Sequence, residues 1–188
     1  MCRNARAGVT MLYNSKDKFG LVSKGLHWTI AFGIIGLIAL GWWMVGLGYY
    51  DPWYHDSLEA HKAVGMVVLA LAFCKIGWQF FNKPPAPGKA LTPNEKNASK
   101  TMHWVLYALM VVVPVTGYIM TTSSGQGVSM FGLFEVPALM QNSESTRDVS
   151  TSIHYYFAYA GIALVLGHAG AALKHHFVNR DDTLTRML

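Results

Sequence analysis

The sequence predicts an all-α integral membrane protein, a bundle of four transmembrane helices. Of its 188 residues, 52% are hydrophobic and 13% are charged, and that charged share is about half of what a soluble domain carries. Four apolar segments each have the roughly 20 residues that a helix needs to cross the hydrocarbon core. Because lipid offers backbone groups no hydrogen-bond partner, segments of this length are expected to be helical.

The four spans form one transmembrane domain and are expected at residues 24–47, 58–81, 101–122 and 152–178. Short connections make sequential helices antiparallel. Residues 1–23 form an N-terminal arm, and residues 179–188 form a C-terminal tail. The first ten residues resemble an upstream extension, because Met11 would also serve as a start, and we assign them no function. The segment VSMFGLFEVPALM is too short to span, and we expect it in the outer interface or capping the bundle.

Positive residues predict the orientation of the bundle. Lysines and arginines gather in the N-terminal arm, the second loop and the C-terminal end. The first loop has neither and carries Asp51 and Asp56, and the third has only Arg147. Positive loops remain in the cytoplasm, so both termini are predicted to be cytoplasmic in a bacterial inner membrane. The net charge of +5 therefore indicates topology and not nucleic-acid binding.

The fourth span contains four histidines, and an imidazole inside a membrane is costly enough to suggest a function. His154 and His168 are the informative two. Fourteen residues at 1.5 Å each place them about 21 Å apart along a helix, and fourteen steps of about 100° return the side chain to within roughly 40° of its first direction. One helix face then presents an imidazole near each side of the bilayer, as two haems stacked across the membrane require.

Three further histidines begin the other spans. His27 and His103 lie near the inner side and His61 near the outer side, so depth pairs His27 with His168 and His61 with His154. Two imidazoles on one iron give a six-coordinate haem b suited to electron transfer and not to oxygen chemistry. His103 shares the depth of His27 and is an alternative ligand of the inner haem. We favour a supporting role for it, hydrogen-bonding a propionate or a quinone.

His175 follows His168 by two helical turns on nearly the same face, at the inner edge of the bundle. A quinone headgroup there could accept a hydrogen bond and a proton from it. A solvated histidine at a helix end is an equal alternative, and for His176 it is the preferred one. Five glycines lie within the spans, where a missing side chain lets a macrocycle or a neighbouring helix approach. They are Gly33, Gly36, Gly65, Gly117 and Gly161.

Several motifs resemble the prokaryotic cytochrome b561 family across about residues 16–188. They are GLHW, EAHKAVGM, MHWVLYALMVVVPVTGYIM, and IHYYFAYAGIALVLGHAGAALKHHF followed by DDTLTRML. The resemblance implies a four-helix di-haem b cytochrome of the inner membrane. Its haem-iron ligands would fall on His27, His61, His154 and His168, and its quinone-linked histidine on His175.

The resemblance also implies a reaction. At least one family member is a superoxide oxidase, an oxidoreductase that passes electrons from periplasmic superoxide to ubiquinone. Similar b-type subunits carry electrons between a partner dehydrogenase and quinone. The acidic first loop departs from the positive funnel that would steer an anion, so a periplasmic redox protein remains an alternative donor. From another class, a histidine-relay proton-coupled transporter predicts a colourless protein, and a purely structural subunit gives no reason for histidines at matched depths.

Overall fold

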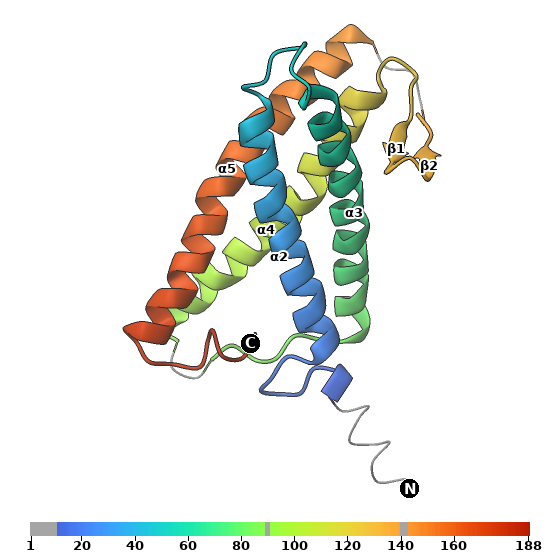
Figure 1. The fold of residues 1–188 in the computed structure, drawn as a ribbon. Helices are drawn as coiled ribbons and strands as arrows, with labels where there is room; N and C mark the ends of the chain where they lie inside the picture. Colours follow the sequence, from blue (N-terminus) through green and yellow to red (C-terminus); the bar gives the residue numbers. More distant parts are fainter. Residues whose placement is uncertain (1–10, 89–90, 140–142) are drawn as a thin grey trace, which may run out of the picture.

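A computed structural model of the chain describes residues 11–88, 91–139 and 143–188. The proposed upstream extension lies outside the described residues. The described chain contains α2 (Leu21–Met44), α3 (Tyr54–Phe81), α4 (Pro93–Thr122) and α5 (Glu144–Phe177) (Figure 1). All four are long and apolar enough to cross a membrane. The predicted four-helix transmembrane bundle is therefore confirmed.

Two helices begin well before the expected spans because polar residues cap them. The Thr92 hydroxyl accepts from the backbone N–H of Glu95, whose side chain in turn accepts from the Thr92 backbone, so α4 starts at Pro93 with a capping box. The hydroxyl of Ser143 caps α5 in the same position. Each helix therefore has a polar first turn outside its apolar span, which a search for apolar runs passes over.

The helices pack as neighbours in a defined order. α2 packs along α3, α3 along α4, and α4 along α5. Within the described residues, α5 packs along neither α2 nor α3 at backbone level. Figure 1 shows α2 and α5 spreading apart toward the end of the bundle where the C-terminus lies. Contacts between α2 and α5 are therefore made by large side chains, such as Trp42 with Tyr159, whose ring centres are 6.0 Å apart.

A small β-hairpin covers part of α3 at the other end of the bundle (Figure 1). It consists of β1 (Val128–Met130) and β2 (Phe134–Val136), paired antiparallel. Val128 and Met130 are buried against Ala63 of α3. The hydroxyl of Tyr118 on α4 donates to the carbonyl of Pro137 at 2.6 Å and accepts from the N–H of Leu139. The apolar stretch of the third loop thus folds as a hairpin that is held on α3 and α4 by these contacts.

The C-terminal tail closes the opposite end. The Trp28 indole N–H donates to the Met187 carbonyl at 2.8 Å, and the Lys24 ammonium donates to the Leu188 carbonyl at 2.6 Å. Arg186 donates to the carbonyls of Asp17 and Ala86, each at 2.8 Å. The tail therefore connects the start of α2, the N-terminal arm and the second loop.

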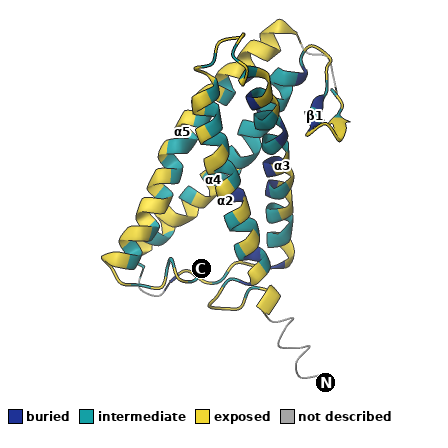
Figure 2. Cartoon of the chain, viewed as in Figure 1, coloured by how far each residue is buried: buried dark blue, intermediate teal, exposed yellow. Residues whose placement is uncertain are grey.

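Buried side chains are sparse, and α5 is exposed over most of its length, whereas α3 and the second half of α4 are mostly half-buried (Figure 2). The buried apolar residues on the helices are Ile30, Ala63, Val68, Leu69 and Ala72. This distribution suits helices surrounded by lipid, where the hydrophobic effect does not drive apolar faces together. The cluster of buried apolar side chains lies between α3 and the hairpin, around Ala63, Val128 and Met130.

Candidate functional site: two facing histidine pairs

Two pairs of imidazoles face each other from different helices. The ring centres of His27 on α2 and His168 on α5 are 6.3 Å apart. Those of His61 on α3 and His154 on α5 are also 6.3 Å apart. Imidazole nitrogens bind metals at about 2 Å, so two imidazoles on opposite sides of one ion hold their ring centres about 6 Å apart. Both pairs have a separation that accommodates one iron.

In the pair nearer the hairpin, a hydrogen bond orients His154. Its Nδ1 lies 2.9 Å from the carbonyl oxygen of Val113 on α4. A carbonyl can only accept, so Nδ1 carries the proton and Nε2 keeps its lone pair. The same carbonyl accepts from the hydroxyl of Thr116 at 2.8 Å. A backbone acceptor on one ring nitrogen that leaves the other free is the usual arrangement behind a metal-binding histidine.

Glycines make room for both rings of this pair. A Cβ at Gly117 of α4 would lie 3.0 Å from Nδ1 and from Cε1 of His154, and a Cβ at Gly41 of α2 would lie 3.2 Å from Cε1 of His61. The Nδ1 atom of His61 is buried and has no hydrogen-bond partner among the described residues. Small residues against the imidazoles and a polar ring atom without a protein partner fit a site completed by a bound group.

The pair nearer the C-terminus has a third imidazole beside it. The ring of His103 on α4 lies 5.3 Å from that of His168, closer than the ring of His27 does. Its Nδ1 donates to the Ser99 carbonyl at 2.7 Å, which leaves Nε2 free. His103 is exposed, whereas His27 and His168 are half-buried. The separation from His168 therefore fits a shared ion better for His27, and His103 lies at the edge of the site.

Trp28 connects this second pair to the tail. Its ring meets His27 edge-on with ring centres 5.4 Å apart, while its N–H donates to Met187. Taken together, the residues present fit two haem groups. Four half-buried imidazoles, two from α5 and one each from α2 and α3, would supply the nitrogens that bind the two irons.

His175 lies at the end of α5 and contacts the chain that follows it. Its Nδ1 is 2.6 Å from Oδ2 of Asp181, and both side chains are largely buried, with 12% and 8% of their surfaces exposed. Asp181 was not among the candidate residues found in the sequence. A carboxylate six residues after a helix-end histidine is a weak signal, because only the reversal of the chain after α5 brings the two together.

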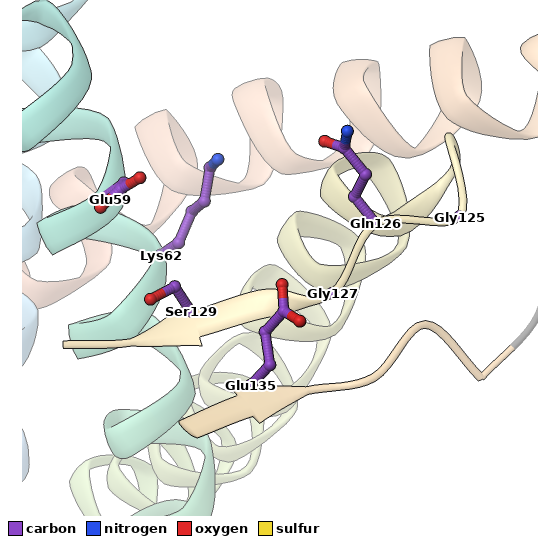
Figure 3. A pocket seen from close by; sticks show the side chains of 7 residues that line it. All are labelled: Glu59, Lys62, Gly125, Gln126, Gly127, Ser129 and Glu135. Atoms are coloured by element: carbon purple, nitrogen blue, oxygen red, sulfur yellow. The ribbon is translucent and has the colours of Figure 1, made fainter. Parts of the chain in front are cut away.

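A polar cavity of about 430 Å³ opens beside the hairpin, next to the helix that carries His61. Figure 3 shows its side chains coming from α3, from the loop before β1 and from the hairpin. Its charged groups are the carboxylates of Glu59 and Glu135 and the ammonium of Lys62. Two carboxylates against one ammonium group make this recess slightly negative.

A family model described as "Prokaryotic cytochrome b561" matches residues 18–188. The chain belongs to the prokaryotic cytochrome b561 family. It is 36% identical to Cytochrome b561 homolog 2 of Escherichia coli (strain K12), over 93% of each chain. It is 30% identical to Cytochrome b561 homolog 1 of the same organism, over 92% of this chain and 97% of the relative. A "Probable superoxide oxidase CybB" of Yersinia pestis is 28% identical, over 91% of this chain and 96% of that protein.

Membership in the cytochrome b561 family implies haem b as cofactor and electron transport as the process. It agrees with the resemblance read from the sequence and with a multi-pass membrane protein. The residues that the sequence did not single out are Gly41, Thr116, the Val113 carbonyl and Asp181. Gly41, the Val113 carbonyl and Asp181 each contact a histidine from another helix or from beyond a helix end, and Thr116 donates to the Val113 carbonyl. No local sequence pattern predicts contacts of this kind.

Proposed function

We propose that the chain carries electrons across the membrane through two b haems. His61 and His154 would hold the outer haem, and His27 and His168 the inner one. The observation that carries the proposal is the equal ring separation of 6.3 Å in two pairs that share α5. Each haem would supply one-electron redox chemistry, and an iron bound by two imidazoles would offer no open site for oxygen. His103 would support the inner haem or the quinone beside it.

We place the C-terminal end of the bundle in the cytoplasm of a bacterial cell, with the chain in the inner membrane. Lysines of the N-terminal arm and of the second loop lie at this end, among them Lys16, Lys24 and Lys83. Positive residues near the ends of spans remain on the cytoplasmic side. Residues 24–178 then form the transmembrane domain, between an arm at 1–23 and a tail at 179–188 that are both cytoplasmic.

Superoxide is our first candidate for the outer donor, and ubiquinone for the inner acceptor. Two superoxide ions would each lose one electron to become oxygen, and one quinone would take up two electrons and two protons to become a quinol. The relative named as a probable superoxide oxidase supports this choice. On the inner side, His175 would lie at the quinone headgroup, because it follows the inner ligand His168 by two turns on a similar face.

A redox protein is the second candidate donor, and the charge of the outer surface favours it. Asp51 lies in the first loop and Asp56 in the first turn of α3, and Glu59 and Glu135 line the cavity beside the hairpin. Negative groups near the entry slow the approach of an anion and attract a positively charged protein. A haem b subunit that receives electrons from such a partner would use the same two histidine pairs.

Two measurements test the proposal. A redox-titrated visible spectrum of the purified protein should show two b haems per chain, whereas a colourless protein would favour the transporter. A superoxide pulse in stopped flow should then reduce the haem of the isolated protein at a rate near the diffusion limit, about 10⁸–10⁹ M⁻¹s⁻¹. Reduction many orders slower, together with fast reduction by a cationic redox protein, would move the donor to the second candidate.

A further inference from the structure

The chain reverses after α5 so that Asp181 meets the side chain of His175. Arg180 adopts a left-handed conformation with φ of 54° at this turn, a conformation that costs roughly 1 kcal/mol or more for a residue with a side chain. The backbone N–H of Asp181 donates to the carbonyl of His175 itself at 3.1 Å. This turn, despite its cost, therefore brings the carboxylate of Asp181 back to His175, six residues earlier in the chain.

Both oxygens of the Asp181 carboxylate are occupied. Oδ2 lies 2.6 Å from Nδ1 of His175, and Oδ1 accepts from the backbone N–H of Thr183 at 2.9 Å. Burial alone would raise the pKa of Asp181, but the hydrogen bonds from Thr183 and His175 hold it below its usual value. The group is thus an ionised carboxylate whose orientation is fixed from two sides.

The position of the imidazole proton follows from this contact. An ionised carboxylate can only accept, so Nδ1 of His175 carries the proton and Nε2 is left with the lone pair. The side-chain nitrogen of Asn179 lies 3.1 Å from the same Nδ1. Since Nδ1 already has its hydrogen, the Asn179 amide fits better with its oxygen toward the ring, as a second acceptor.

Other charges around the imidazole come from the neighbouring elements. Glu95 in the first turn of α4 interacts electrostatically with both His175 and Lys174. The tail that carries Asp181 is held in turn by Arg186, which donates to Asp17 and Ala86. The carboxylate therefore belongs to a segment anchored at both of its ends.

We propose that Asp181 is a positioning residue of the inner quinone site, holding His175 with Nε2 directed away from the carboxylate and ready to exchange a proton. The inference rests on the proposed function, because it deepens the role of His175 there. During quinone reduction the N–H bond at Nε2 of the imidazolium would break as an O–H bond forms on the quinone. The imidazole would regain its proton from water at the inner surface, and the nearby carboxylate would compensate its charge.

The test uses the purified haem-loaded protein in detergent and follows the rate at which a short-chain ubiquinol reduces the haem. Asp181→Asn keeps the shape of the side chain but removes its charge. The neighbouring Asp182→Asn is the matched control, because the Asp182 side chain is exposed and its ion pair with Arg186 is long at 4.0 Å. We expect Asp181→Asn to slow this step about tenfold or more, as loss of an orienting partner does elsewhere. Asp181→Glu should recover part of the rate, and Asp182→Asn should match the unaltered protein.

A second measurement does not depend on quinone. Nitrogen NMR of labelled histidine, assigned with His175→Gln, should show Nδ1 of His175 protonated in the neutral ring. Asp181→Ala should give a mixture of the two tautomers, while the haem spectrum stays unchanged.

The outcomes separate the two proposals. If ubiquinol fails to reduce the haem of the unaltered protein, the quinone function is wrong and the inference is wrong with it. If ubiquinol reacts but Asp181→Asn equals Asp182→Asn in rate, or the tautomer is unaffected by Asp181→Ala, the positioning role alone is overturned.

Discussion

The two ends of the bundle build their histidine pairs by different means. At the hairpin end, contacts within the helices hold the rings, with His154 bonded to the Val113 carbonyl and with glycines of α2 and α4 against the imidazoles. At the other end, no described glycine contacts His27 or His168 in this way, and segments outside the spans reach the site through Trp28. The pair at the hairpin end is therefore positioned by helix packing, and the pair at the other end depends also on the contacts of the C-terminal tail.

The largest effect is expected from the histidines themselves. His61→Ala or His154→Ala should lose the outer haem, and His27→Ala or His168→Ala the inner one, because a haem with one axial ligand removed is held weakly. Haem content per chain should fall from two to one in each case, measured by pyridine haemochrome and redox titration. The remaining spectrum should differ between the outer and inner variants. His103→Ala should retain both haems, and its loss of one would make His103 an inner ligand.

A bulkier residue at Gly117 should break the outer site alone. Gly117→Val places side-chain atoms where the His154 ring lies, and because that ring is hydrogen-bonded to α4 it has little freedom to move. We expect the outer haem to be absent from most chains, with the inner haem kept. Gly170→Val is the matched control, since Gly170 is exposed on α5, about 160° around the helix from His154, and a Cβ there meets nothing within 4 Å. Equal haem content in the two variants would show that the ring is not confined at Gly117.

Changing the charge of the cavity beside the hairpin should have a smaller effect, one that distinguishes the two candidate donors. Replacing both Glu59 and Glu135 with glutamine turns the recess from negative to positive. Haem reduction by superoxide should become about threefold faster at low salt and should lose that gain at high salt, because screening removes steering. Reduction by a cationic redox protein should slow instead. Unchanged rates with both donors would place electron entry elsewhere on the outer surface.

The smallest effect is expected at low pH, in how firmly the C-terminal tail is held against the bundle. The pKa of Asp181 is lowered in the folded protein, so its stabilising contribution is complete above the ordinary value of about 3.9 and is lost as pH falls through the lower folded-state value. Hydrogen exchange of residues 179–188, corrected for intrinsic rates, should be constant from pH 8 to 5 and should rise at lower pH. In Asp181→Asn that acid-dependent rise should be missing.

The sequence predicted the spans and the separation of histidines along α5 because both are local and periodic. An apolar run long enough to cross a membrane predicts a helix by itself. His154 and His168 lie on one such helix, so their spacing follows from regular helix geometry. The early starts of α4 and α5 were missed because capping residues such as Thr92 and Ser143 lie outside the apolar runs. The contact between His175 and Asp181 could not be foreseen, since it depends on the left-handed Arg180 and on tail bonds to distant segments.

The sharing of α5 limits how this helix can change during evolution. Insertion of one residue between His154 and His168 would turn one imidazole by about 100° relative to the other, so at most one of the pairs could keep its partner. Insertion of seven residues would restore the direction to within about 20° but lengthen the distance between the rings by about 10 Å. Both pairs therefore require the interval of fourteen residues between His154 and His168. Differences in length among relatives should be confined to the loops and termini.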